Sequence, residues 1–152
     1  MTDGFCLENA MKRFLCAALA ALGIASTGTV LAAVNADAVH LALNSLLLAS
    51  SKMSVVNAMN RTGKPPANNA EARLGSPNTM TTNEISSIVV TAGGVLNVYL
   101  SAATGTNHGV VRFTPAVSTD RKGGKSVAFT CTSPNVPEIA TLQSGCSYAA
   151  GQ

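Results

Sequence analysis

The sequence predicts an α+β fold in which one long N-terminal helix packs on a four-stranded antiparallel sheet. Three observations predict it: a long stretch with helical periodicity, four later runs with strand character, and two cysteines near the C-terminus. The chain has 152 residues, of which 47% are hydrophobic and only 11% charged. This length supports one modest domain, and the composition requires an additional, unusually apolar segment.

An apolar run near the N-terminus predicts export. The run FLCAALAALGIA covers 14–25 and directly follows Lys12 and Arg13. A basic start, an apolar middle and small residues behind it are typical of a signal peptide. The alternative is a retained membrane anchor, although the run is short for an unbroken bilayer span. The start residue is either Met1 or Met11.

The small residues after this run predict where the signal is removed. We expect cleavage between Ala32 and Ala33, because the residues before this bond have the size and spacing that a signal peptidase accepts. A cut after Ala36 is the second choice. Residues 1–32 would then be an upstream extension and signal peptide, and 33–152 would form the folded domain.

The folded domain is predicted to contain four consecutive parts. They are a helix at 35–61, a connecting loop at 62–84, the sheet at 85–131 and a disulfide-bounded loop at 131–146.

The segment 35–61 is predicted to be one continuous helix. Apolar residues recur in it at three- and four-residue steps, and they give a face that we expect against the sheet: Val39, Leu43, Leu46, Leu47, Met53 and Val56. Three polar residues are predicted on the opposite face: Asn44, Ser51 and Lys52.

The stretch TGKPPANNAEARLGSP at 62–77 ends this helix and starts a new turn. Gly63 stands where a left-handed C-cap residue belongs. The two prolines that follow prevent continuation, because neither has an N–H to donate. Asn68 or Asn69 is then the predicted N-cap of a short helix.

Four runs rich in β-branched residues predict the strands. Gly93 and Gly94 separate the first two runs and predict a hairpin. The segments HGVVRFTP and KSVAFTC supply the other two strands, and AATGTN and AVSTDRKGG are the predicted loops. Four residues of the last two strands are expected to face the core: Val111, Phe113, Val127 and Phe129.

Cysteine usage agrees with export. Cys6 and Cys16 fall in the N-terminal segment, which leaves Cys131 and Cys146 in the predicted domain. An isolated pair in an exported domain predicts a disulfide. A metal site is a poor alternative, because two cysteines with no nearby histidine cannot complete a tetrahedral shell.

Basic residues exceed acidic ones in the predicted domain. Beyond Ala32, eight lysines and arginines stand against five aspartates and glutamates, which leaves a net charge of +3. The segment DRKGGK concentrates Arg121, Lys122 and Lys125. These three are the candidate contact for DNA or an anionic glycan, because clustered cations attract phosphate and sulfate arrays. The alternative is a solvated loop that keeps an apolar chain soluble.

The sequence carries no pattern typical of an enzyme. His40 and His108 have no Cys, Asp or Glu at ligand spacing beside them, and no GxSxG-type nucleophile setting is present. The glycine clusters lack the strand–loop–helix context of a phosphate-binding loop. We therefore expect neither catalysis nor a cofactor or metal.

Several segments together resemble a known family. LASSKMSVVNAMNRTGKPPANNAEARL, ISSIVVTAGGVLNVYL, a strand that runs into Cys131, and a late Cys146 are similar to the globular head of a type IV pilin of the major-pilin kind. The resemblance covers 43–148, and TG-x-x-P-x-NNAEA-x-L is its most specific part. It implies a subunit of an extracellular filament that acts in adhesion, twitching motility and DNA uptake. The disulfide-bounded loop would be exposed.

The N-terminus departs from the family's pattern. Gly4 and Phe5 resemble the pilin processing site, but Glu8 arrives one residue early. Lys12 and Arg13 would enter the hydrophobic filament core, where an unpaired charge is costly. Retained in the mature chain, these charges oppose normal assembly.

Two functions follow as expectations. The first is a pilin or pilin-like subunit on a pilus or the cell surface, with other pilin subunits, the pilus machinery and a host receptor as partners. The second is a soluble head, periplasmic or secreted, that contacts DNA, an anionic glycan or the pilus machinery. In either case the membrane would be met only through the N-terminal segment before cleavage.

Overall fold

The computed structural model of the chain divides into two units, Met1–Leu31 and Ala32–Gln152. The structure describes residues 33–106 and 108–151, all in the second unit. The predicted signal at 1–32, including Ala32 of the expected cleavage site, lies outside the described residues. Ala33 lies within them, ahead of the first described helix.

The helical layer consists of α2 (Ala36–Leu43) and α3 (Leu46–Thr62). The predicted long helix is present as α3, but the continuous span expected at 35–61 is interrupted. Ser45 has extended backbone angles, and its Oγ accepts the Leu48 N–H at 3.2 Å, so it starts α3 as an N-cap. Asn44 ends α2 with its amide bonded to the His40 carbonyl at 2.9 Å. Such local bonds compete with helix continuation.

This interruption changes which side of the helix is buried. The buried residues of α3 are Leu48, Ser51, Val55, Ala58 and Met59. The expected core positions Leu46 and Met53 are instead 85% and 59% exposed. Ser51, predicted on the outer face, is fully buried and donates its hydroxyl to the Leu47 carbonyl at 2.7 Å. The break at Ser45 rotates α3 about its axis relative to a continuation of α2. The three- and four-residue spacing that starts in α2 therefore does not predict which residues of α3 are buried.

The sheet has five strands in the order β1-β2-β3-β4-β5. Their bounds are β1 (Ile85–Thr91), β2 (Val95–Leu100), β3 (Val110–Thr119), β4 (Lys125–Ser133) and β5 (Cys146–Tyr148). The first four run antiparallel, as predicted, whereas β5 pairs parallel to β4. The α+β class is therefore confirmed, and the four-stranded count is corrected to five. A strand of three residues carries too little periodicity to be predicted.

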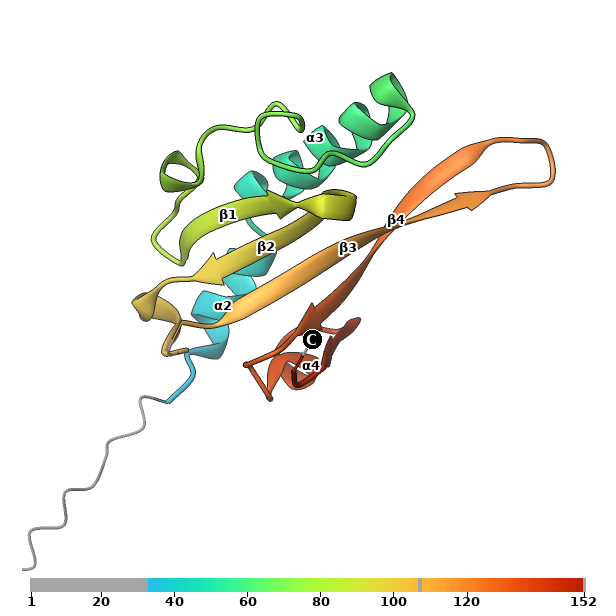
Figure 1. Cartoon of the computed structure of the whole chain (residues 1–152). Coiled ribbons are helices and arrows are strands. Elements are labelled where there is room, and N and C mark those ends of the chain that lie inside the picture. The colour runs from blue at the N-terminus through green and yellow to red at the C-terminus, as the bar shows by residue number, and fades with distance from the viewer. Residues whose placement is uncertain (1–32, 107, 152) are drawn as a thin grey trace, which may run out of the picture. The chain divides into compact units, whose positions relative to one another are not determined.

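Short helical elements connect these strands: η1 (Pro77–Thr79), η2 (Ala92–Gly94), η3 (Ala102–Thr104) and α4 (Ile139–Leu142). The predicted turn at Gly93 and Gly94 is confirmed. Both residues have positive φ, 84° and 74°, which glycine adopts without the steric penalty of a side chain. They close the hairpin of β1 and β2 (Figure 1).

The core lies between the helices and the sheet, with α2 and α3 beside β1, β2 and β3 in Figure 1. Val111 and Phe113 are buried as expected, while Val127 and Phe129 are half-buried at its border. By length and composition, Ala36–Thr62 is also apolar enough to cross a membrane. Core helices pass the same test, and in this unit the buried side of α3 packs into the core.

The loop after α3 begins as the sequence predicts. Gly63 has φ 71° and forms the left-handed C-cap. Asn68 accepts the Glu71 N–H at 2.9 Å, and Glu71 accepts the Ala67 N–H at 2.8 Å, in a reciprocal arrangement close to a capping box. The predicted short helix is only a turn, because its hydrogen bonds do not continue beyond Leu74.

Asn69 has a different role from its neighbour. Its buried amide donates to the carbonyls of Gly75 and Ile88, each at 3.0 Å, and its oxygen accepts the Val90 N–H at 2.6 Å. The last two partners belong to β1. One side chain therefore fixes the loop 63–84 to the outer edge of the sheet.

The hairpin of β3 and β4 projects beyond the rest of the sheet (Figure 1). Pairing of β2 with β3 ends at Leu96 and Phe113, and beyond it 114–119 pairs with 125–130 and with no other described strand. We call residues 114–130 the arm. The sequence placed 116–119 in a loop, but the ladder continues to Thr119 opposite Lys125, so the true loop is 120–124.

Candidate functional site

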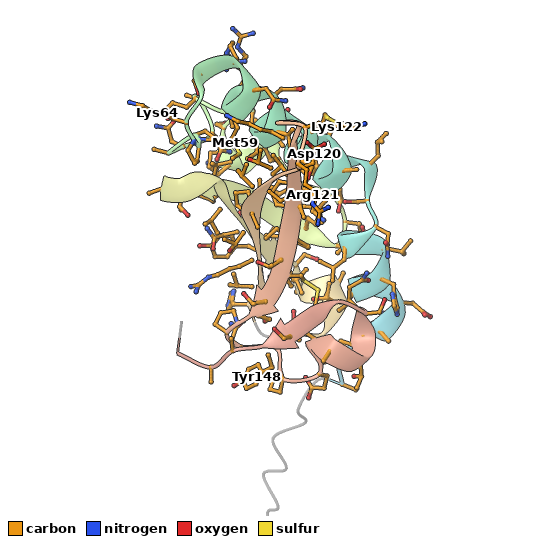
Figure 2. All side chains as sticks on the ribbon, turned by 90° about the vertical axis from the view of Figure 1, so that its right-hand side faces the viewer. Met59, Lys64, Asp120, Arg121, Lys122 and Tyr148 are labelled. Carbon is orange, nitrogen blue, oxygen red and sulfur yellow. A yellow bond between two sulfur atoms is a disulfide. The ribbon has the colours of Figure 1, made fainter. Side chains whose placement is uncertain are left out.

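The tip of the arm brings together all three cations of the predicted polyanion contact. Arg121 and Lys122 lie in the loop, and Lys125 is the first residue of β4. All three are exposed. Figure 2 shows Asp120, Arg121 and Lys122 grouped at the tip, with Lys64 toward the same end of this unit and Tyr148 toward the opposite end.

Asp120 organises this tip. Its Oδ1 accepts the N–H groups of Lys122 at 2.8 Å and Gly124 at 2.7 Å. Its backbone N–H also donates to the Gly124 carbonyl at 2.8 Å. The carboxylate thus holds the loop backbone and contributes one negative charge among the three positive ones. The sequence grouped these residues correctly but did not indicate this role.

Further basic residues lie where α3 ends. Arg61, Lys64 and Arg73 line a shallow recess of about 450 Å³ together with the two prolines of the loop and Glu71. Arg61 donates to the Glu71 carbonyl at 3.3 Å. The sequence separates these cations by the loop, so only the turn that folds 68–74 back toward α3 brings them together.

The predicted disulfide is present. Cys131 and Cys146 are bonded, with their Cα atoms 4.4 Å apart, and they are register partners in β4 and β5. The bond closes a loop that contains α4. It therefore ties the last strand to the base of the arm.

Beside the disulfide is a recess that the sequence did not predict. It encloses about 260 Å³ and is lined by residues of the α2–α3 junction, the sheet and the C-terminal loop: Leu43, Asn44, Lys52, Phe113, Phe129, Cys131, Gln143, Ser144, Gly145 and Cys146. Lys52, expected on the solvent face of a continuous helix, instead lies half-buried with its Nζ 3.7 Å from the centre of the Phe113 ring. The signal that could have found it is the Asn44–Ser45 break, which resets the helical phase.

The two histidines are separate from these features. His40 lies exposed on α2, and His108 lies exposed in the loop before β3, where its carbonyl accepts the Asn135 amide at 3.0 Å. Within 33–106 and 108–151, no group of three or more His, Cys, Asp and Glu residues could hold a metal ion.

No protein-family model and no curated protein matches this chain.

Proposed function

We propose that this chain is an exported, pilin-like structural subunit of a surface filament that acts in adhesion. The observation that supports this is the order of parts in the described unit. A helical layer is followed by a loop fixed to the sheet edge, four antiparallel strands and a disulfide that ties the chain end to the fourth strand. This order agrees with the pilin resemblance of the sequence.

The outer side of the helices offers a surface for neighbouring subunits. Leu41 on α2 and Leu46 and Met53 on α3 are large apolar side chains that are mostly exposed. Hydration of such side chains is unfavourable, and a filament contact would remove them from water. Subunits related by one repeated operation would all use the same patch.

The first test is the N-terminal sequence of the protein recovered from an exporting bacterial host that has a pilus assembly system. A start at Phe5 supports entry into a filament through the retained N-terminal segment. A start at Ala33 supports a head released without that segment. Electron microscopy of sheared surface material, labelled with antibody to residues of the head, shows whether filaments contain the chain.

A matched pair of variants tests the helical patch. Leu46→Asp combined with Met53→Asp adds charge to the apolar surface and should abolish labelled filaments. Asn78→Asp adds charge at an exposed position outside α2 and α3, in η1, and should leave them intact. Filaments formed equally well by both variants would exclude this patch as the contact. A monomeric product with an Ala33 start and no labelled filaments would overturn the subunit proposal.

The alternative function is a soluble exported head that binds a polyanion. The exposed cations at the tip of the arm favour it, because a projecting loop can reach an extended phosphate or sulfate array. It predicts salt-dependent binding without filaments.

A further inference from the structure

The arm has two unlike faces. Four apolar residues share one face, because they are register partners at alternate positions of β3 and β4: Pro115 with Phe129 and Val117 with Val127. Lys125 lies on the same face, two positions beyond Val127 toward the tip. The apolar face packs against the core at Phe129 and emerges from it toward the tip, where Val117 is 54% exposed. The other face carries small side chains: Thr114, Ala116, Ser118, Ser126, Ala128 and Thr130.

The arm is also part of a positively charged end of the described unit. Gly94 donates its N–H to the Pro66 carbonyl at 2.9 Å, so the loop after α3 lies at the turn between β1 and β2. The arm continues past the same turn, where the pairing of β2 with β3 has ended. Glu71 and Asp120 lie among the cations of this end (Figure 2). Six of the eight lysines and arginines beyond Ala32 gather there: Arg61, Lys64, Arg73, Arg121, Lys122 and Lys125.

The opposite end of this unit is negatively charged. The Ser101 N–H donates to the Glu84 carbonyl at 2.8 Å, which places the start of β1 beside η3. The Asn35 N–H donates to the Thr104 carbonyl at 2.8 Å, which places the start of α2 beside η3 as well. Val110, at the start of β3, donates its N–H to the Asn135 side chain shortly before α4. These bonds bring together the segments that carry three acidic residues: Asp37 in α2, Glu84 before β1 and Glu138 before α4.

Asp37 and Leu41 offer the arm a matching surface on α2. They are one helical turn apart and both exposed, Leu41 by 62%. Four residues of helix span about 6 Å, and the two strand positions from Val127 to Lys125 span about 7 Å. A strand of the arm laid along α2 can therefore cover Leu41 with Val127 and bring its cation to the acidic residue. The Asp37 carboxylate has no hydrogen bond or ion pair to another described residue, so it is available to a cation.

We propose that the apolar face of the arm docks on the outer side of α2 in a second copy of this chain. Val117 and Val127 cover Leu41 of that copy, and Lys125 pairs with its Asp37. The contact removes apolar surface from water and joins the positive end of one copy to the negative end of the next. A polyanion would engage the tip cations but leave the apolar face uncovered, so a second copy fits both features.

This inference deepens the proposed subunit role and rests on it for the idea that copies meet at the helical patch. The arm and α2 are different surfaces, so each copy can place its arm on one neighbour and receive the arm of another. Such a contact repeats along an open chain. Two arm tips repel one another, which favours this arrangement over a symmetric pair of arms.

The test is cross-linking of the exported chain with a carbodiimide, which joins an amine directly to a carboxylate. Wild-type protein is coupled at high concentration, or as filaments where these form, because a contact of this size is weak between free copies. We expect peptide mass spectrometry to find Lys125 joined to Asp37. The tip of the arm and α2 lie at opposite ends of one unit, so this link joins two copies (Figure 1). Its yield should fall as salt is added, because both charges are exposed and screened.

Variants that keep this amine and carboxylate test the apolar contact. Val117→Asp and Leu41→Asp should each reduce the yield of the link by about fivefold or more, since each places a charge in the contact. Ala116→Asp introduces the same charge on the other face of the arm, one position away, and should leave the yield unchanged. The double variant Lys125→Asp with Asp37→Lys exchanges the charged partners and should again give a link between the same two positions.

Failure of this contact and failure of the subunit role give different results. Filaments that contain the chain but lack the link would overturn the contact and leave the subunit role intact. The link in protein that forms no filaments would support the contact after the subunit role had failed. Equal loss of the link in Val117→Asp and Ala116→Asp would also overturn the contact. Concentrated wild-type protein that binds mixed-sequence DNA through the tip but gives no link would assign the arm to a polyanion instead.

Discussion

The edge of the sheet at β1 is covered by a loop, whereas the arm formed by β3 and β4 has open edges. At β1, the loop 63–84 covers the edge, and Asn69 occupies the Ile88 carbonyl and the Val90 N–H as a neighbouring strand would. At the arm, no strand of the described residues lies on the outer side of 114–119 or of 125–130. A covered edge cannot recruit another chain, whereas an uncovered one presents free backbone groups. The sheet is therefore closed to further pairing at β1 and open along the arm.

The arm nevertheless carries features that limit unwanted pairing. Pro115 in β3 has no N–H to offer to another strand. The three cations at the tip repel a second copy of the same tip. Apolar exposure is limited, although Val117 is 54% exposed. The arm therefore exposes a cluster of positive charge at its tip, while its open edges are poorly suited to pairing with another strand.

The largest effect is expected from the disulfide, which anchors the base of the arm to β5. Replacing Cys131 and Cys146 by Ser should lower the free energy of unfolding by about 3 kcal/mol, the value expected for a closed loop of about 15 residues. Chemical denaturation measures this loss. Intact mass after alkylation, with and without reductant, checks the bond itself, and two free thiols in the unreduced exported protein would contradict it.

The next effect should come from opening the covered edge. Asn69→Ala removes three hydrogen bonds to backbone groups, two of them on β1, and should cost about 2 kcal/mol after relaxation of the loop. Asn68→Ala is the matched control, because it removes the cap bond and an exposed amide bond to the Glu71 carboxylate but none to β1, and it should cost about 1 kcal/mol. Denaturation midpoints measure both. Equal losses would mean that Asn69 acts only as part of the turn.

The sequence predicted this part of the fold well where the signal is local. A helix stop at Gly63 and a glycine hairpin at 93–94 depend on backbone preferences that neighbouring residues determine. The role of Asn69 could not be predicted, because its partners in β1 are 19 and 21 positions away. Asn68 and Asn69 look equivalent in the sequence, and only tertiary packing distinguishes them.

The two candidate sites also differ in how far the sequence predicts them. The tip cations are consecutive or nearly so, and their grouping follows from the sequence. The recess combines Lys52 with Gln143 from the far end of the chain, so it depends on the interrupted helix and on the disulfide. Because α3 begins anew at Ser45, Lys52 faces Phe113. The spacing of apolar residues continued from α2 had predicted Lys52 on the solvent face.

A smaller effect is expected within the arm. Val117→Thr changes an exposed side chain that is the register partner of Val127 across the hairpin, and should alter the free energy of unfolding by less than about 0.5 kcal/mol. Thermal unfolding of the variant and the wild-type chain provides the comparison. A loss above about 1 kcal/mol would mean that the arm is packed against something in solution, because an exposed position is otherwise tolerant.

The smallest effect on stability is expected at the tip, where substitutions should change binding and not the free energy of unfolding. Replacing Arg121, Lys122 and Lys125 by Ala should leave the unfolding midpoint unchanged, because all three side chains are exposed and Asp120 keeps its backbone bonds.

If the tip binds nucleic acid, each phosphate contact adds about 0.9 to the slope of log affinity against log salt. The triple variant should therefore flatten that slope by up to about 2.7. Titration against mixed-sequence DNA at several salt concentrations measures it, and changing His40 and His108 together serves as the control that should leave it unaltered. Equal slopes for the wild type and the triple variant would exclude the tip as the binding surface, and no binding at low salt would exclude nucleic acid as its partner.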